Sequence, residues 1–264
     1  MDLQLKNKKA LVTGSTAGIG LAIAKQLAKE GADVVINGRT KERIDAAIKE
    51  IKDDFKDAKV SGIAADFSKV EEINNLLKAL PEVNIIINNV GIFEPKPFLE
   101  IPDEDWLNFY EINVLSGVRL SRHYFPAMIK KNWGRIIFIS SESAVNIPEE
   151  MIHYGMTKTA QLSVSRGLSE LTKGTGVTVN AVLPGPTQSE GVGGFMEKLA
   201  KHDNMTVEEA EKSFFLKARP TSLLQRFASV DEVANMVTYI ASPLSSATNG
   251  ASIKVDGGVL KTIF

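Results

Sequence analysis

Runs of consecutive apolar residues, many of them β-branched, recur along this chain and are separated by longer amphipathic stretches. Two examples are Ile85-Ile86-Ile87 and Ile136-Ile137-Phe138-Ile139. A strand with one solvated face alternates apolar and polar residues, so an unbroken apolar run indicates a strand covered on both faces, as in a parallel sheet. The predicted strands are Ala10–Thr13, Asp33–Asn37, Val60–Ala64, Asn84–Asn88, Arg135–Ser140, Val177–Val182 and Ser252–Val255.

Helical patterns lie between these strands, at Leu21–Lys29, Arg43–Lys52, Val70–Leu80, Trp106–Lys131 and Thr157–Leu171. Alternating β and α segments favour an α/β fold with a doubly wound parallel sheet and right-handed crossovers. The 264 residues contain no linker, repeat or low-complexity segment, which predicts a single domain over 1–264. The least regular stretch predicts an insertion at about 190–227, of the kind that commonly forms a lid or a binding loop.

The composition excludes several classes of protein. The formal net charge is -1 and no basic block is present, so we expect no binding to nucleic acid or to an anionic membrane surface. Without cysteine and with only three scattered histidines, no metal site is expected. No apolar run approaches the roughly 20 residues of a membrane span, and the N-terminal residues lack an apolar signal core. The expected location is the cytoplasm.

Three glycines, Gly14, Gly18 and Gly20, follow the first predicted strand and open the first predicted helix. Without Cβ atoms the backbone can turn tightly and approach a phosphate, whose charge is stabilised at a helix N-terminus. This pattern predicts a dinucleotide-binding loop, although the spacing is Gly-x-x-x-Gly-x-Gly. The alternative is a strand–turn–helix corner that binds nothing.

The residues just past the second predicted strand should meet the adenosine ribose of a dinucleotide. An acidic residue there would bind a 2′-hydroxyl, whereas an arginine accommodates a 2′-phosphate. The chain has Arg39 there, with Lys41 and Arg43 nearby, which favours NADP(H) and leaves NAD(H) as the alternative cofactor. The alternative for Arg39 itself is a solvated arginine at a helix start. Asp66, after the third strand, is either a hydrogen-bond acceptor for the adenine amine or a helix cap.

Tyr154 and Lys158 stand at i and i+4, on one face of a predicted helix, and Ser141 ends an apolar strand. A tyrosine titrates at about pH 10, and an ammonium about 4 Å away contributes around 4 kcal/mol at an effective dielectric of ~20. We expect the charge of Lys158, with the positive nicotinamide of a cofactor as a further aid, to bring that pKa close to neutrality. Tyr154 could then act as general acid or base, and Ser141 could stabilise a developing alkoxide. The alternative for the isolated pair is a chance spacing without a catalytic role.

Asn113 lies inside the predicted helix Trp106–Lys131, where asparagine is a mediocre helix former because its side chain competes for backbone hydrogen bonds. It could bend the helix locally and hold a water that connects Lys158 to solvent. The alternative is a surface asparagine.

Several stretches spread over essentially the whole chain form one recognisable set: Thr13-Gly-Ser-Thr-Ala-Gly-Ile-Gly20, Asp66, Asn88-Asn89-Val90-Gly91, Asn113, Ser141, Tyr154-Gly-Met-Thr-Lys158, Asn180-Ala-Val-Leu-Pro184-Gly185 and Asp256-Gly257-Gly258. In their order and spacing, the chain resembles the short-chain dehydrogenase/reductase family. The resemblance implies a Rossmann-type sheet of seven parallel strands and hydride transfer between a nicotinamide and the carbonyl or secondary alcohol of a small molecule. It also implies a homotetramer or a homodimer.

The resemblance further implies the site residues. The catalytic tetrad would be Asn113, Ser141, Tyr154 and Lys158, and Asn88 would support the central sheet. The implied cofactor-binding residues are Gly14, Ser15, Thr16, Gly18, Ile19, Gly20, Arg39, Asp66, Asn89, Gly91, Tyr154, Lys158, Pro184, Gly185, Thr187 and Ser189. Three positions depart from the family pattern: Val90 replaces an alanine, Ser189 a threonine, and Ala17 lacks the basic side chain of many NADP-preferring members.

The substrate is expected to be of medium size and partly apolar. The residues expected to border the nicotinamide are Phe93, Glu94, Glu142, Ser143, Asn146, Ile147 and His153, joined by Phe195, Met196, Phe214 and Phe215 from the insertion. The insertion residues could instead pack its helices together. His153 should point elsewhere on its helix than Tyr154.

Two other functions fit the sequence less well. One is a 3-oxoacyl-carrier-protein reductase, but the chain has Asn132 and Thr175 near the positions where those enzymes typically show arginines for docking the carrier. The charges nearby are those of Lys130, Lys131 and Lys173, so docking is possible but not indicated. The other is a non-catalytic regulator that binds NADP, against which the intact Tyr154 and Lys158 argue.

Overall fold

The structure is a computed structural model that describes residues 2–263, except for the side chain of Phe195. Its main sheet has seven strands in the order β3-β2-β1-β4-β5-β6-β9, and all neighbouring strands run parallel. The strands are β1 (Lys9–Val12), β2 (Asp33–Gly38), β3 (Val60–Ala64), β4 (Ile85–Asn88), β5 (Gly134–Ile139), β6 (Val177–Pro184) and β9 (Ser252–Val255). The seven-stranded doubly wound sheet predicted from the sequence is confirmed.

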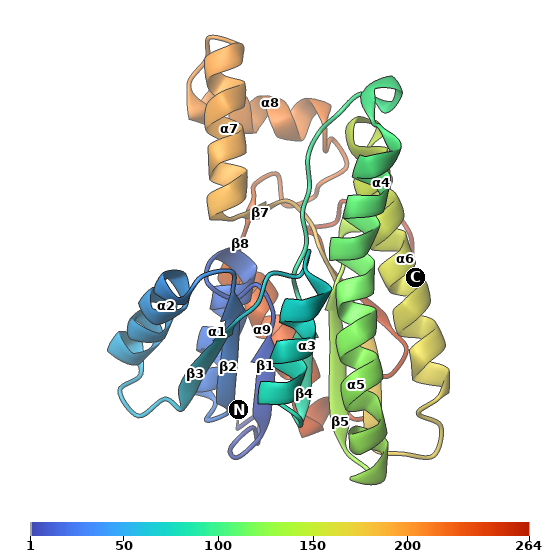
Figure 1. The fold of residues 1–264 in the computed structure, drawn as a ribbon. Coiled ribbons are helices and arrows are strands. Elements are labelled where there is room, and N and C mark those ends of the chain that lie inside the picture. The colour runs from blue at the N-terminus through green and yellow to red at the C-terminus, as the bar shows by residue number, and fades with distance from the viewer. Residues whose placement is uncertain (1, 264) are drawn as a thin grey trace.

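Helices cover both faces of this sheet (Figure 1). They are α1 (Gly18–Lys29), α2 (Lys41–Asp54), α3 (Val70–Ala79), α4 (Asp103–Tyr110), α5 (Ser116–Lys130), α6 (Ile152–Glu170) and α9 (Val230–Ala241). Side chains of α1, α2 and α9 pack with strand residues in one hydrophobic cluster. Side chains of α3, α5 and α6 pack in a second cluster, with strand residues that point to the opposite face of the sheet.

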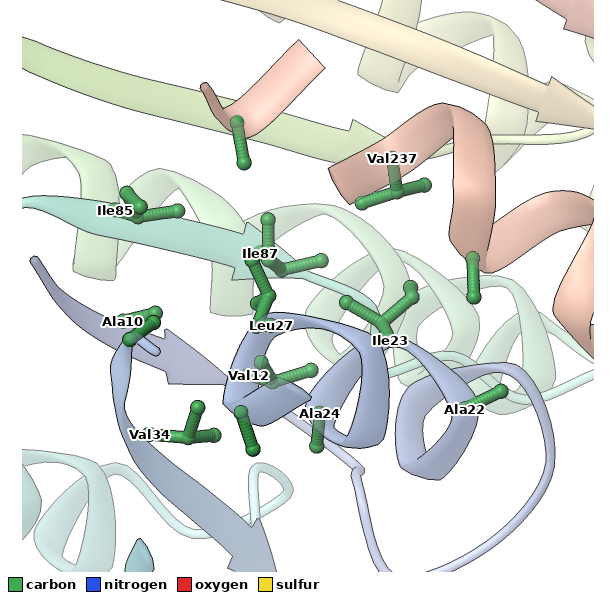
Figure 2. Close-up of a cluster of buried hydrophobic side chains, with 14 of the residues drawn as sticks. Ala10, Val12, Ala22, Ile23, Ala24, Leu27, Val34, Ile85, Ile87 and Val237 are labelled. Atoms are coloured by element: carbon green, nitrogen blue, oxygen red, sulfur yellow. The ribbon is translucent and has the colours of Figure 1, made fainter. Parts of the chain in front are cut away.

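Burial explains why the strand residues are apolar in succession. All residues of β4, β5 and β6 are buried, whereas β3, at one edge of the sheet, is only partly so. Figure 2 shows the first cluster: Ile23 and Leu27 of α1 lie among Val12, Ile87 and Val237. Removing apolar surface of this kind from water stabilises the fold by about 25 cal/mol per Å². The buried central strands are therefore stable elements, and they hold the loops at their carboxyl ends in place.

The predicted helix over Trp106–Lys131 is wrong in detail. The helical path begins earlier, at Asp103, and is divided into α4 and α5 by a π-helical turn, Glu111–Leu115, that contains Asn113. A π-helical turn adds one residue to the turn, which shifts the hydrogen-bond register without ending the helix. The predicted Thr157–Leu171 also begins late, because α6 starts at Ile152 and thereby includes Tyr154 in its first turn.

The segment between β6 and β9 carries α7 (Glu190–His202) and α8 (Val207–Lys217), which stand beyond the carboxyl ends of the strands in Figure 1. Two short parallel strands, β7 (Thr187–Gln188) and β8 (Ala228–Ser229), join the base of this segment. It has its own hydrophobic cluster, which includes Met196, Phe215 and Phe227. Within residues 2–263, no helix combines the length and the apolar character that crossing a bilayer demands.

Candidate active site

The glycine loop lies between β1 and α1, at the point where the sheet order reverses from β2 to β4 around β1. Gly14 and Gly18 have φ angles of +60° and +56°, in the left-handed region that favours glycine. A Cβ on Gly20 would overlap the carbonyl oxygen of Gly14. Ala17, the residue before α1, offers no side-chain cap, so the first amides of α1 remain available to an anion such as a phosphate.

Side chains behind the loop hold its shape. The Asn89 amide donates to the carbonyl oxygens of Thr13 and Gly14 at 2.9 and 3.1 Å. The Ser15 hydroxyl donates to Val12 O at 2.6 Å and accepts from the amide of Asn37 at 3.0 Å. Ser15 is fully buried, so its side chain serves the loop itself. Asn88, implied as a support for the central sheet, donates to Ser121 Oγ at 3.2 Å.

A depression beside the loop contains the residues expected to meet the adenosine half of a cofactor. Thr16, Arg39 and Asp66 line it, together with Arg43. Arg39 is exposed there. One oxygen of Asp66 accepts hydrogen bonds from the main-chain amide and the hydroxyl of Ser68. The hydrogen bond from the main-chain amide is the main reason why the pKa of Asp66 lies below its usual value. Asp66 therefore lies in the depression and also caps the turn before α3.

The residues predicted for proton transfer line one cavity of about 320 Å³. Ser141 follows β5, and Tyr154 and Lys158 come from the first turns of α6. Ile19 and Gly91 reach this cavity from the side of the glycine loop, and a further wall consists of Pro184, Gly185, Thr187 and Ser189. The fold thus brings residues from five separate segments of the chain to the carboxyl ends of the central strands.

Lys158 is buried in this cavity wall, with 4% of its surface exposed. Its Nζ donates to the carbonyl oxygen of Ile139 at 3.0 Å and lies 3.4 Å from Oε1 of Gln161. The distance from Nζ to the centroid of the Tyr154 ring is 5.5 Å. A Cβ on Gly91 would come within 3.4 Å of the same Nζ. The absence of a side chain at Gly91 therefore keeps the space in front of the ammonium open.

The expectation that Lys158 brings the pKa of Tyr154 close to neutrality is wrong for the polypeptide itself. Burial raises the pKa of Tyr154 to about 12, although the hydrogen bond from Ser141 opposes this rise. Burial also lowers the pKa of Lys158 to about 8. Desolvation disfavours the charged form of both groups and here outweighs the attraction between their charges. The hydrogen bonds of the ammonium also go to Ile139 and Gln161 rather than to the phenol.

Asn113 is fully buried, so it is not a surface asparagine. Its side-chain oxygen accepts from the amide of Ile92 at 2.7 Å, and its Nδ2 donates to Ile92 O and Thr157 Oγ1, each at 3.0 Å. Its main-chain oxygen accepts from Nε2 of Gln161 at 2.6 Å. Asn113 thus ties the loop after β4 to α6, and Gln161 spans the gap between Asn113 and Lys158.

The structure divides the residues expected around the substrate into two groups. Phe93, Glu142, Ser143 and Phe214 line the cavity. The lining does not include Glu94, Asn146, Ile147, His153, Met196 or Phe215, and the side chain of Phe195 is outside the described part of the chain. Met196 and Phe215 instead pack the insertion together. His153 packs against Phe109, with 4.1 Å between ring centroids.

Sequence reasoning missed Gln161 and Arg219. Gln161 lies at i+3 from Lys158, and this helical spacing was a usable signal for a shared face. Arg219 follows α8 and meets Glu142, with 2.8 Å between Nε and Oε1. No local pattern could have indicated a contact across 77 positions. Among residues 2–263, no cluster of histidine and acidic side chains is suited to a metal.

The family model for short chain dehydrogenase matches residues 8–200. The chain is 50% identical to the uncharacterized oxidoreductase YvaG of Bacillus subtilis and 32% identical to the D-beta-hydroxybutyrate dehydrogenase of Cupriavidus necator. These alignments cover 100% of both chains in the first case, and 96% of this chain and 98% of the relative in the second.

Among solved structures, the L-sorbose reductase of Gluconobacter frateurii in complex with NADPH and L-sorbose superimposes with a TM-score of 0.92, at 30% identity and over 100% of both chains. The chain belongs to the short-chain dehydrogenase/reductase family. It is an NAD(P)-dependent oxidoreductase.

Proposed function

We propose that this protein uses NADP(H) to reduce the carbonyl group of a small, partly apolar molecule, with Tyr154 as the proton donor. The observation that carries the proposal is the single cavity lined by Ser141, Tyr154 and Lys158, which adjoins the depressions around the glycine loop. Either a proton-transfer group or a phosphate-binding loop alone would fit several functions. Together, at the carboxyl ends of parallel strands, they fit a nicotinamide-dependent reaction.

The residues present fit a dinucleotide. The uncapped N-terminus of α1 and the positive φ angles of Gly14 and Gly18 suit a pyrophosphate. At the other end, Thr187 and Ser189 lie on the cavity wall and would hold the carboxamide of the nicotinamide. The cavity wall at Gly185 is tightly packed, since a Cβ there would lie 2.6 Å from the carbonyl oxygen of Asp256. When bound, the nicotinamide supplies or accepts the hydride.

The chain's own groups manage the proton. With its pKa raised to about 12, Tyr154 keeps its proton at neutral pH, which suits donation to an alkoxide and thus carbonyl reduction. Ser141 would hydrogen-bond the substrate oxygen and stabilise the charge that develops on it. Lys158 would bind the cofactor and add a positive charge near the phenol, and Asn113, through Gln161, would hold Lys158 in place.

The preference for NADP(H) rests on Arg39 and Arg43, which line the depression expected to hold the adenosine ribose. An arginine binds a 2′-phosphate through charge-assisted hydrogen bonds, whereas the strand end offers no carboxylate to a 2′-hydroxyl. The NADPH named for the L-sorbose reductase complex supports the same choice.

Carrier-protein reduction is a weaker candidate. A relative named as a 3-oxoacyl-carrier-protein reductase, from Aquifex aeolicus, is 31% identical over 98% of this chain and 100% of the relative. However, Asn132 accepts a hydrogen bond from the amide of Gly176 at 2.8 Å and has a positive φ angle, so it serves a turn. Neither Asn132 nor Thr175 offers a positive charge to an acidic carrier. A purely regulatory role would leave the joint presence of Tyr154 and Lys158 unexplained.

We further infer that residues 1–264 act as one domain in a cytoplasmic homotetramer or homodimer. This association is proposed from the family membership, because single exposed apolar side chains such as Leu107 (69% exposed) and Leu171 (67% exposed) are also normal on monomers.

The experiment is a panel of ketones and secondary alcohols offered to the purified protein with NADPH, NADH and their oxidised forms. We expect carbonyl-dependent oxidation of NADPH with a higher kcat/KM than with NADH. Acetoacetyl thioesters are included, and a rate equal to that of the best small ketone would support the carrier-protein reductase instead. Tight binding of NADPH without turnover of any carbonyl or alcohol would support the regulator.

A further inference from the structure

A buried ion pair forms part of the wall of the substrate cavity. Glu142 directly follows Ser141 and is 3% exposed, and Arg219, from the end of the insertion, is 6% exposed. Arg219 Nε donates to Glu142 Oε1 at 2.8 Å. Both side chains line the same cavity as Tyr154. Moving charged side chains out of water costs free energy unless they are well paired. The presence of a buried ion pair beside Tyr154 therefore needs an explanation.

The two oxygens of Glu142 are used unequally. Oε1 accepts from Arg219 and also from Ser143 Oγ at 3.2 Å. Oε2 is shielded from solvent and has no hydrogen-bond partner among the residues that the structure describes. A buried acceptor left without a donor destabilises a protein, whereas a donor supplied by a ligand restores the lost hydrogen bond. Glu142 lines the cavity and the terminal torsion of a glutamate is soft, so rotation of the carboxylate, with the two oxygens exchanging places at Arg219, is the movement that would offer a free oxygen to a ligand.

The charge of the pair restricts the kind of donor. Arg219 Nη1 donates to the carbonyl oxygen of Ala218 at 2.8 Å and lies 3.7 Å from a carboxylate oxygen of Glu150. Two carboxylates therefore face one guanidinium, so this group of charges offers no uncompensated positive charge to a substrate anion. The cavity lining also includes the apolar side chains of Phe93, Val192 and Phe214, and the Phe214 ring lies beside Arg219, with 5.8 Å from its centroid to Cζ.

We propose that Glu142 accepts a hydrogen bond from a hydroxyl group on the carbon next to the reacting carbonyl, so that the substrate is a neutral α-hydroxy ketone. This inference rests on the proposed function, in which Ser141 holds the carbonyl oxygen, and on the position of Glu142 in the lining of the same cavity. In the reduction the carbonyl carbon gains the hydride and its oxygen the proton of Tyr154, while the adjacent hydroxyl is unchanged. The product is a vicinal diol.

Three ketones of similar size test this with the wild-type protein and NADPH. In 3-hexanone a methyl group replaces the hydroxyl of 1-hydroxy-2-pentanone, and 1-methoxy-2-pentanone keeps an oxygen there but cannot donate. We expect kcat/KM for the hydroxy ketone to exceed both others at least about tenfold, because a site built around a hydroxyl rejects analogues that leave its polar group unpaired. The methoxy ketone controls for the electron-withdrawing effect of the oxygen.

Two variants connect the preference with Glu142. In Glu142→Gln an amide nitrogen, which can donate to an ether oxygen, replaces one acceptor, so we expect the preference for the hydroxy over the methoxy ketone to fall at least about fivefold. Glu149→Gln, an exposed residue that does not line the cavity, should keep the wild-type preference.

Equal kcat/KM for 1-hydroxy-2-pentanone and 3-hexanone would overturn this inference and leave the proposed function intact, because both ketones are then reduced. Turnover of no ketone in any panel would overturn the proposed function and this inference with it. If Glu142→Gln fails to fold, the wild-type comparison of the three ketones still decides.

Discussion

The side-chain amide of Gln161 connects Asn113 with Lys158. Its Nε2 donates to the main-chain oxygen of Asn113 at 2.6 Å, and its Oε1 accepts from the ammonium of Lys158 at 3.4 Å. The carbonyl of Asn113 lies in the π-helical turn between α4 and α5. Such a turn leaves main-chain groups out of the regular helical hydrogen-bond pattern. A glutamine that is 2% exposed thus spans the gap in which the sequence analysis expected a water molecule.

We expect Gln161→Met to lower kcat about tenfold with little change in the KM for NADPH. Methionine fills a similar volume but offers Lys158 no comparable acceptor, and a hydrogen bond to a charged group contributes about 1.5–3 kcal/mol. Steady-state kinetics over a range of pH measures the effect. Gln161→Glu should instead move the pH profile of alcohol oxidation upward, since a carboxylate beside Lys158 favours retention of protons by the Tyr154–Lys158 pair.

The control is Gln188→Met, a change at an exposed glutamine on β7 that makes no hydrogen bond to Lys158 or Asn113. Wild-type kinetics and an unshifted pH profile in both Gln161 variants would show that the bridge only fills space.

Tyr154→Phe should reduce carbonyl-dependent NADPH oxidation by about 10³-fold, the order of magnitude of general acid catalysis. The phenol is the proposed proton donor, whereas the ring, which packs edge-on against Phe93 at 6.3 Å between centroids, is retained. NADPH affinity, measured by fluorescence titration, should remain nearly unchanged. Tyr110→Phe, on α4 outside the cavity, is the matched control. Turnover at the wild-type rate would exclude Tyr154 as the donor.

Lys158 should reduce the stability of the fold at neutral pH. Its pKa falls from 10.5 in the unfolded chain to about 8 in the folded protein. Below about pH 8 the group is charged in both states, and its burial then costs about 3 kcal/mol before its hydrogen bonds are counted. The cost decreases as pH rises from about 8 to 10.5, because the folded state no longer holds the charge.

Lys158→Met should therefore raise the free energy of unfolding at pH 7 by on the order of 1–3 kcal/mol, with a smaller gain near pH 10, while it abolishes turnover. Urea denaturation at the two pH values provides the measurement. A variant less stable than the wild type at pH 7 would mean that the hydrogen bonds of Lys158 to Ile139 and Gln161 outweigh the cost of burying its charge.

The strands were predictable because β4, β5 and β6 are buried on both faces, and burial appears in a sequence as unbroken apolar runs. The π-helical turn at Asn113 could not be predicted, since one extra residue in a turn hardly alters an amphipathic pattern. The pKa of Tyr154 was misjudged because spacing along a helix indicates proximity but not solvent exclusion. The meeting of Arg219 with Glu142 depends on how the insertion folds back, which no local pattern encodes.

Arg39→Ala should weaken NADPH binding about tenfold and leave NADH binding almost unchanged. Arg39 lines the depression beside the glycine loop, and its charge-assisted hydrogen bonds would go to the 2′-phosphate that only NADPH carries. Their exposure to solvent keeps the expected loss near the lower end of the range for such bonds. Arg43 lines the same depression but lies 3.6 Å from Glu190, which compensates part of its charge.

Titrations with both cofactors measure the effect, and Lys41→Ala is the control, because Lys41 pairs with Asp45 and does not line the depression. An equal loss of affinity for NADPH and NADH would remove the argument for a 2′-phosphate site and return NAD(H) as the cofactor.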